Sequence, residues 1–298
     1  MAVTSRTTAN KVAVKAKAGT PAKTAVKKTT KNKTAITTAG AKAIVETKAV
    51  AKKAVTKKTV AKQTAAATPS VPELLDVAMA ALKRASSKAV RDGMTRFNIP
   101  NTNALGVKMA DIQKVGKQLG RHHELAEALW KTGVYEARML CAYVAEPERV
   151  TPAQMDRWAK DFDNWAVCDT LCFALWDRTP HAWKKAEQWT KKTAEFEKRA
   201  GFALFWCLSV HDKAAPDAGF LKGLQLIESG ATDERHFVKK AVNMALRAIG
   251  KRNKALNAAA VTVATRLAAS QDATARWIGK DALREITSPV VRKRVANK

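Results

Sequence analysis

The stretch DFDNWAVCDTLCFALW, from Asp161 to Trp176, decides the fold class of this chain. Its apolar side chains recur at intervals of three and four residues and neither proline nor glycine interrupts them, so the pattern predicts a helix. Trp165 and Asp169 are four residues apart, which places an indole and a carboxylate one above the other on one helix face. The pair is a candidate site, although a core tryptophan beside a carboxylate that caps or salt-bridges a neighbouring helix has the same spacing.

The same helical period runs from Glu73 almost to the end of the chain, and no convincing alternating strand interrupts it. Helix starts are marked by Thr151 with Pro152 and a capping-box Gln154, and by Thr232 with two acids after it. The predicted helices are 73–96, 108–119, 122–131, 135–145, 152–160, 163–177, 180–192, 195–210, 217–229, 233–249, 253–269 and 272–286. Short helices joined by short loops favour an all-α fold, an α-solenoid of HEAT-like antiparallel helix pairs, with an irregular helical bundle as the alternative.

Residues 1–70 form a different kind of sequence, a low-complexity mixture of Ala, Lys, Thr and Val without aromatic residues. Sixteen basic residues and one acid give this segment a net charge of +15. It has too little apolar surface to offset the conformational entropy of folding, so we expect a disordered basic tail that binds phosphates without regard to sequence. A transit peptide is the alternative, but such peptides favour arginine and the segment contains only Arg6.

Residues 71–298 form the second predicted domain, and they carry +13 of the total charge of +28. A basic folded part indicates a polyanionic partner, so we expect this domain to bind DNA even without the tail. A solenoid that only binds other proteins is an alternative, but such a protein does not need a net charge of +13 on its folded part. No signal-peptide core and no long apolar run is present, which favours a cytoplasmic, nucleoid-associated protein without a membrane partner.

The four cysteines, Cys141, Cys168, Cys172 and Cys207, all lie in apolar helical surroundings. Cys168 with Cys172, and Cys207 with His211, are spaced so that two helices could present them to one zinc ion. No CxxC-type spacing supports such a site, and free cysteine packs readily as a small core residue. We therefore predict reduced, packed cysteines and no metal.

Short motifs in a fixed order across residues 91–253 resemble the DNA alkylation repair glycosylases built from HEAT-like repeats, the AlkD-like family. They are Leu105-Gly106-Val107, Tyr135-Glu136-Ala137-Arg138, Met155-Asp156-Arg157-Trp158, Asn164-Trp165 through Asp169, Lys198-Arg199-Ala200, and Phe237-Val238-Lys239-Lys240-Ala241-Val242-Asn243 ending in Arg247. The resemblance implies a monofunctional glycosylase that excises cationic alkylated purines, 3-methyladenine and 7-methylguanine, from double-stranded DNA. It implies no metal and no small-molecule cofactor. A solenoid with a concave groove needs no partner subunit, so we expect a monomer, although the sequence leaves the oligomeric state open.

The resemblance also assigns roles to individual residues. It places the catalytic carboxylate on Asp169, the sugar-packing indole on Trp165, and basic contacts to the DNA backbone on Arg199 and Arg247. The family usually has a second tryptophan where this chain has Met244. This departure weakens an aromatic clamp on the DNA, and it leaves open a non-enzymatic protein that recognises DNA structure.

The chemistry of the residue types agrees with these roles. A cationic purine is a good leaving group, and its departure leaves positive charge on the sugar that a carboxylate stabilises and an indole face attracts. Lys240, Asn243 and Arg247 share a stripe on the predicted helix 233–249, which favours a DNA-facing surface, although a solvated basic face has the same pattern. We expect Arg199 to reach a phosphate, and a salt bridge to Glu195 is the alternative.

Overall fold

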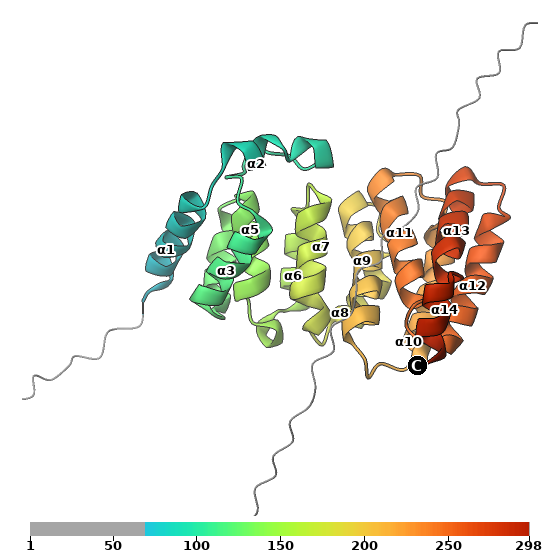
Figure 1. Ribbon diagram of the computed structural model, residues 1–298. Helices are drawn as coiled ribbons and strands as arrows, with labels where there is room; N and C mark the ends of the chain where they lie inside the picture. The colour runs from blue at the N-terminus through green and yellow to red at the C-terminus, as the bar shows by residue number, and fades with distance from the viewer. Residues whose placement is uncertain (1–68, 298) are drawn as a thin grey trace, which may run out of the picture. The chain divides into compact units, whose positions relative to one another are not determined.

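The computed structural model describes residues 69–297, and the tail predicted for residues 1–70 lies almost wholly outside them. Within this range the chain is helical (Figure 1). The α-helices are α1 (Val71–Arg84), α2 (Lys88–Asp92), α3 (Met109–Leu119), α4 (His123–Lys131), α5 (Tyr135–Val144), α6 (Pro152–Lys160), α7 (Trp165–Ala174), α8 (Ala182–Trp189), α9 (Glu195–His211), α10 (Asp217–Gly230), α11 (His236–Ile249), α12 (Lys254–Ala268), α13 (Ala273–Ile286) and α14 (Pro289–Ala296). Three 3₁₀ turns are η1 (Thr95–Phe97), η2 (Pro147–Arg149) and η3 (Trp176–Arg178).

Consecutive helices pair and the pairs stack, as the sequence predicts for a HEAT-like solenoid. Helices α4 and α5, α8 and α9, and α12 and α13 pack as neighbours in sequence. The helices α3, α5, α7, α9, α11 and α13 contact one another in that order and form one continuous layer (Figure 1). The all-α solenoid is thereby confirmed, and the layer that contains α7 is the one that positions the candidate site.

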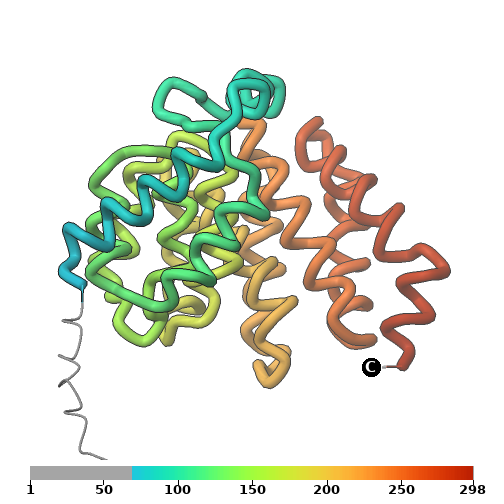
Figure 2. The backbone as a smooth tube through the Cα atoms, turned by 60° about the vertical axis from the view of Figure 1, so that its left-hand side comes forward, coloured from blue at the N-terminus to red at the C-terminus, as the bar shows by residue number. Residues whose placement is uncertain are grey.

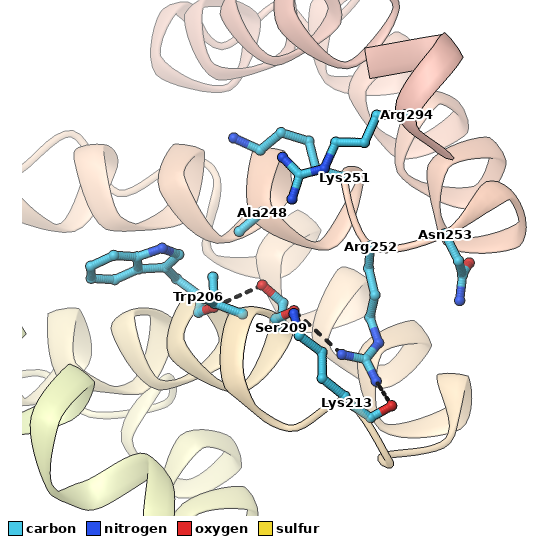
Figure 3. Close-up of a pocket in the computed structure, with 9 residues that line it drawn as sticks. Trp206, Ser209, Lys213, Ala248, Lys251, Arg252, Asn253 and Arg294 are labelled. Atoms are coloured by element: carbon cyan, nitrogen blue, oxygen red, sulfur yellow. Dashed lines mark hydrogen bonds between the residues drawn. The ribbon is translucent and has the colours of Figure 1, made fainter. Parts of the chain in front are cut away.

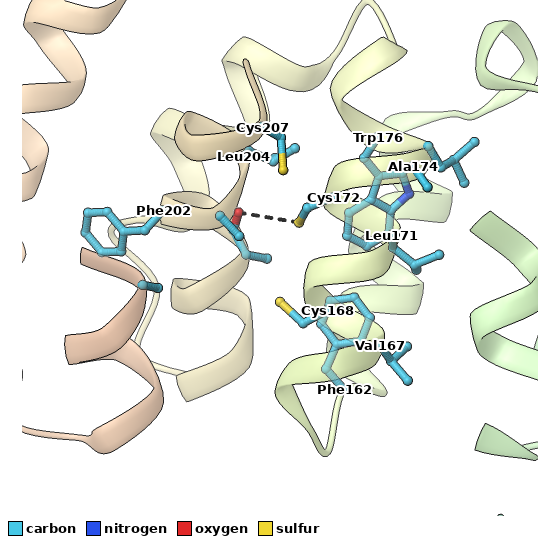
Figure 4. Packing of buried hydrophobic residues seen from close by; sticks show 14 of the residues in the cluster. Phe162, Val167, Cys168, Leu171, Cys172, Ala174, Trp176, Phe202, Leu204 and Cys207 are labelled. Carbon is cyan, nitrogen blue, oxygen red and sulfur yellow. Dashed lines mark hydrogen bonds between the residues drawn. The ribbon is translucent and has the colours of Figure 1, made fainter. Parts of the chain in front are cut away.

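The core of the layer is made by aromatic and small apolar side chains. Trp176 is fully buried and Trp130 nearly so, as expected for packing residues, and Trp130 stacks on Trp158 with ring centroids 4.5 Å apart. Cys168 and Cys172 face α9 from α7, where their thiols point to the carbonyls of Phe196 and Ala200 (Figure 4). Large rings beside small thiols let neighbouring helices approach closely, because each ring fills the space that a smaller residue leaves.

Two predicted helices are interrupted in the structure, and the reason in each case is local. The predicted helix 73–96 ends at Arg84, because Ser87 caps a new helix by accepting a hydrogen bond from the Val90 amide. The predicted helix 163–177 ends at Ala174, and the chain tightens there into η3. Apolar residues keep the same spacing on both sides of each break, so the helical period of the sequence does not show where one helix ends.

Two helix ends also differ from the prediction. The predicted start at Thr232 is wrong: α11 begins at His236, because Asp233 accepts hydrogen bonds from Lys198 and Arg235 instead of capping a helix. Helix α14 was not predicted, although Ser288 caps it and Pro289 occupies its first position.

Among the residues that the structure describes, no helix has the length and apolar character needed to cross a membrane.

Candidate active site

The candidate site lies where α7, α9 and α11 meet at their N-terminal ends. Asn164 caps α7 by accepting a hydrogen bond from the Val167 amide, and this fixes Trp165 as the first residue of the helix. Asp169 follows one turn later, and the side chains of both residues are partly buried. The Arg199 guanidinium from α9 lies 6.0 Å from the centre of the Trp165 ring. The predicted pairing of an indole and a carboxylate on one helix face is therefore present, with an arginine between α7 and α11.

Arg199 and Asp169 form a two-point ion pair. Arg199 Nε donates to Asp169 Oδ1 at 2.9 Å, and Nη2 donates to Oδ2 at 2.6 Å. The third contact of the guanidinium is a hydrogen bond from Nη1 to the Phe237 carbonyl at 2.7 Å, which ties α9 to α11. The Arg199 side chain is 6% exposed and the Asp169 side chain 15%. Two parallel hydrogen bonds between a guanidinium and a carboxylate fix the orientation of both groups.

Burial and pairing act in opposite directions on these two groups. Burial raises the pKa of the Asp169 carboxyl above its usual range, and the Arg199 guanidinium opposes this shift. Burial also lowers the pKa of Arg199, but the neighbouring Asp169 carboxylate more than offsets it, so that the pKa of Arg199 is raised. Each charge is thus retained in a poorly solvated site because the other is present.

The structure contradicts the alternative role of Arg199, a salt bridge to Glu195, while its contact with a phosphate stays a prediction. The guanidinium is turned inward to Asp169 and Phe237, and the residue also lines the depression described below. It also makes no salt bridge with Glu195, which instead accepts a hydrogen bond from the Phe237 amide at 3.3 Å. The spacing along α9 could not reveal this, because the true partner of Arg199 is thirty residues away in sequence.

An aromatic residue that the sequence reasoning missed lies beside Trp165. The segment between α2 and α3 reaches across the end of α7 (Figures 1 and 2), and the Trp165 indole nitrogen donates to the Phe97 carbonyl at 2.9 Å. The Phe97 side chain is 55% exposed. The sequence offers one signal of a turn here, Asn98 directly after Phe97, because asparagine tolerates the left-handed conformation. In the structure Asn98 has a φ of 55° and ends η1.

A buried carboxylate anchors the segment that carries Phe97. Glu136 accepts hydrogen bonds from the amides of Leu105, Gly106 and Val107 at 2.8, 2.7 and 3.1 Å. Gly106 has a φ of +81°, and a Cβ there would lie 2.2 Å from the Ser87 carbonyl oxygen. The Leu105-Gly106-Val107 motif and Glu136 are therefore parts of one structure, which holds the segment above the candidate site.

Together these side chains line an open depression of ≈ 180 Å³. Its lining residues are Phe97, Asn98, Trp165, Arg199, His236, Phe237 and Lys240. Asp169 is bound to Arg199, one of these lining residues, and lies one helical turn after Trp165 on α7. The depression is smaller than the pockets of about 300–1,000 Å³ that enclose whole ligands. It therefore suits contact with part of a large molecule.

The three residues of the stripe predicted on α11, Lys240, Asn243 and Arg247, differ in their exposure to solvent. Lys240 is exposed, and its ammonium lies 4.7 Å from the centre of the Trp277 ring. Asn243 is only 3% exposed and donates to the Ile278 carbonyl at 3.3 Å, so its side chain does not lie on the surface as the predicted stripe requires. Met244 is partly buried and packs against the core. An amide that holds α11 to α13 follows the same helical period as a surface contact.

Arg247 is paired with acids from α13. Its Nη1 lies 3.4 Å from Asp281 Oδ2, and its Nε lies 2.8 Å from Glu285 Oε2. Its side chain is 33% exposed. The second predicted basic contact is thus neutralised within the protein, and Lys240 is the member of the stripe that offers a cation to solvent.

The cysteines and histidines do not converge on a metal in the described part of the chain. Between residues 69 and 297, no three side chains of His, Cys, Asp or Glu are placed to hold an ion. His211, the zinc candidate on α9, is hydrogen-bonded to Asp177. All four cysteines are free and buried, and burial raises the pKa of the Cys172 and Cys207 thiols well above the usual range. These thiols are therefore protonated packing groups.

Comparison with known proteins places this geometry in a family context. Residues 78–286 match the model of a family described as DNA alkylation repair enzyme. One similar solved structure is described as belonging to "a new family of proteins related to the HEAT-like repeat DNA glycosylases with affinity for branched DNA structures". It has a TM-score of 0.62 at 20% sequence identity, and the match covers 74% of this chain and 95% of that chain. No curated protein matches this chain.

Proposed function

Since the chain belongs to the DNA alkylation repair enzyme family, we propose that it binds double-stranded DNA and hydrolyses the N-glycosidic bond of cationic alkylated purines. The substrates in this proposal are 3-methyladenine and 7-methylguanine. The observation that carries it is the carboxylate of Asp169, paired with Arg199 at 2.6 and 2.9 Å and one helical turn after the Trp165 indole on α7. A fixed negative charge beside an aromatic face is the environment that a cationic sugar and a cationic base both favour.

In the proposed reaction the glycosidic bond breaks with its electron pair going to the purine. The alkylated base leaves as a neutral molecule, and the sugar is left with oxocarbenium-like charge that the Asp169 carboxylate stabilises. A water molecule then adds to the sugar and releases its proton, so a reducing sugar remains in the DNA. Arg199 keeps Asp169 charged and oriented, and the exposed ring of Phe97 and the partly buried ring of Trp165 contact the lesion.

The shape of the depression supports excision without enclosing the base. A volume of ≈ 180 Å³ is too small for a pocket that encloses a flipped nucleotide. An open depression does admit the sugar edge of a strand whose base stays in the stack. This is the mode of action that the resemblance to the AlkD-like family implies, and it requires neither a metal nor a cofactor. We place the protein in the cytoplasm with the chromosome, acting as a monomer.

A second candidate function is recognition of DNA structure without excision. Two observations favour it. Both oxygens of Asp169 already accept hydrogen bonds from Arg199, which weakens the field that the carboxylate exerts on a sugar. Met244 offers no π-face for the cationic base. The similar solved structure is described as having affinity for branched DNA, so branched DNA is the structure to test.

The deciding experiment measures release of 7-methylguanine from duplex DNA at saturating protein, for the wild type and for Asp169→Asn. The matched control is Asp281→Asn, because Asp281 is also ion-paired to an arginine but lies on α13, outside the depression. We expect release by the wild type and by Asp281→Asn, and a loss of at least about a hundredfold for Asp169→Asn with unchanged duplex affinity. Melting temperatures identify any variant that is simply unfolded.

No release by the wild type, together with salt-sensitive DNA binding, would overturn the glycosylase proposal. In that case the affinity for a four-way junction against a matched duplex tests the second candidate. A preference of at least about tenfold for the junction supports recognition of branched DNA, and equal affinities exclude it.

A further inference from the structure

A larger pocket, of ≈ 380 Å³, lies at the other end of the same helix layer. It opens where the C-terminal ends of α9 and α11 meet α14 (Figure 3). The lining residues are Trp206, Ser209, Val210, Lys213, Ala248, Lys251, Arg252, Asn253 and Arg294. Trp206 is seven residues from Arg199 on α9, which corresponds to about 10 Å along the helix. The pocket is therefore separate from the depression beside Asp169, and its volume is in the range usual for ligand sites.

The pocket has four cationic side chains, and two of them are already engaged within the protein. Arg252 donates to the carbonyl of Ser209 in the last turn of α9, and to those of Lys213 and Ala215 in the segment that follows α9. Lys251 is paired with Glu285. These two residues fix the shape of the wall, because Arg252 holds the turn after α11 against the end of α9, and Lys251 holds the same turn against α13.

The other two cations are available to a ligand. Lys213 and Arg294 are exposed, and neither forms a salt bridge with an acid in the described range of residues 69–297. Their charged groups point into the space between α9 and α14 from opposite sides (Figure 3). Two converging cations without a counter-charge are suited to a phosphate group, which supplies the missing negative charge.

One aromatic ring completes the pocket. Trp206 is partly buried, and Phe173 stacks on it with ring centroids 5.0 Å apart and an interplanar angle of 27°. Phe173 is in turn held by His211, at 4.3 Å between centroids. The indole is thus braced from the α7 side. Ala248, a small side chain, lines the pocket together with Trp206.

We propose that this pocket binds one unpaired nucleotide of a DNA strand. The base lies against Trp206, and its phosphate lies between Lys213 and Arg294. The inference rests on the DNA-binding part of the proposed function and is independent of base excision. It gives the molecule a second DNA contact at Trp206, about 10 Å along α9 from Arg199. A strand that leaves the duplex near the lesion would be held there.

The pocket has few free polar groups with which to read a base. The Ser209 hydroxyl donates to the Trp206 carbonyl at 2.7 Å, and the Asn253 side chain caps α12 and binds Asp217 at 2.9 Å. Stacking on an indole is possible for every base, because each has a π-face. We therefore expect binding of an unpaired nucleotide of any sequence.

The test uses the full-length protein and two unmodified duplexes, one blunt and one with a single-stranded overhang of thymidines. The wild type should bind the overhang duplex about tenfold more tightly than the blunt one. Trp206→Leu should reduce that ratio to less than about two. The matched control is Trp277→Leu, since Trp277 is a partly exposed tryptophan outside the pocket, and it should leave the ratio at about ten.

A second variant covers the case in which Trp206→Leu fails to fold. Lys213 and Arg294 are exposed, so the double variant Lys213→Gln/Arg294→Gln should fold normally. For the overhang duplex, it should lower the slope of log affinity against log salt by about 0.7, the value for one phosphate of a single strand. The slope for the blunt duplex should stay the same.

Two results would overturn the proposal. One is a wild type that binds the two duplexes equally. The other is a double variant that weakens both duplexes by the same factor, since the pocket would then be part of a surface that follows paired DNA. Because neither probe contains an alkylated base, both results are independent of the excision assay, and a failure of excision leaves this test unaffected.

Discussion

The two ends of the layer formed by α7, α9 and α11 use arginine in opposite ways. At the N-terminal end, Arg199 is buried and its charge is balanced by Asp169 at 2.6 Å. At the C-terminal end, Arg294 is exposed and has no acidic partner within residues 69–297. The first arrangement fixes a carboxylate for chemistry, and the second leaves a cation free for a phosphate. A basic residue in the sequence therefore does not identify a DNA contact until its partner is known.

The difference also changes where the charge of the folded part acts. Arg247, which the resemblance assigns to the DNA backbone, is shared between Asp281 and Glu285, whereas Lys240, seven residues earlier on α11, is exposed. The net charge of +13 on residues 71–298 is thus not spread evenly over the predicted stripe. Removing one cation at a time from each end tests this comparison directly.

The largest expected effect is on stability, at the buried end. Arg199→Met should lower the free energy of unfolding by about 3 kcal/mol, because it leaves Asp169 buried without its counter-charge. Arg294→Met, at the exposed end, should change it by less than about 0.5 kcal/mol. Urea unfolding monitored by circular dichroism measures both.

The double variant Asp169→Asn/Arg199→Met is the control for this prediction. It removes the unpaired charge as well, so it should recover a large part of the stability lost in Arg199→Met. A cost of less than about 1 kcal/mol for Arg199→Met would mean that Asp169 is well solvated, and the contrast between the two ends would then disappear.

A smaller effect, with a pH dependence, is expected at Asp233. Hydrogen bonds from Arg235 and Lys198 hold the pKa of Asp233 well below its usual range. A depressed pKa in the folded state contributes stability above the unfolded pKa of about 3.9, and this contribution is lost as the pH falls toward the folded value. Asp233→Asn should therefore cost about 1 kcal/mol at pH 7.

The measurement for Asp233 is urea unfolding of both proteins at pH 7, 5 and 3. The difference between wild type and variant should be nearly the same at pH 7 and pH 5. It should narrow by pH 3, because the Asp233 carboxyl of the unfolded chain takes up a proton there while that of the folded protein stays ionised. A difference that stays constant down to pH 3 would contradict the contribution of the ionised group.

The smallest expected effect is on the salt dependence of duplex binding. Lys240→Met should lower the slope of log affinity against log salt by about 0.9, because an exposed lysine is free to neutralise one phosphate. Arg247→Met should leave the slope unchanged, since Asp281 and Glu285 already hold that charge. Titration between 50 and 200 mM salt separates the two. An equal loss in both variants would show that DNA draws Arg247 away from its acids.

Much of the fold could be predicted from the sequence, because the spacing of apolar residues within a short segment is enough to indicate a helix. The period of three to four residues located every α-helix from α3 to α13 within a few positions, and Thr151 with Pro152 marks the start of α6 as expected. The breaks at Ser87 and Leu175 and the short α14 were missed. Such interruptions depend on caps and on neighbouring helices, and these leave the apolar period of the sequence unchanged.

The candidate site was only half available from the sequence. The pairing of Trp165 and Asp169 follows from one helical turn, so spacing predicts it. Phe97 reaches the same place from a segment sixty-eight residues earlier in the chain, held there by Glu136. No local pattern connects these elements, because the contact exists only after α5 and α7 have stacked.

The sequence by itself determined the all-α class, the succession of helices, the basic character of the folded part, and the presence of an indole and a carboxylate on one turn of α7. The tertiary structure alone decided that Arg199 turns inward to Asp169, that Asn243 is buried, and that Lys213 and Arg294 face one pocket. The physical reason is that helical periodicity fixes only the direction in which a side chain leaves its own helix. Whether that direction meets an acid, a carbonyl or solvent depends on the neighbouring helix, which is supplied by residues about thirty or more positions away.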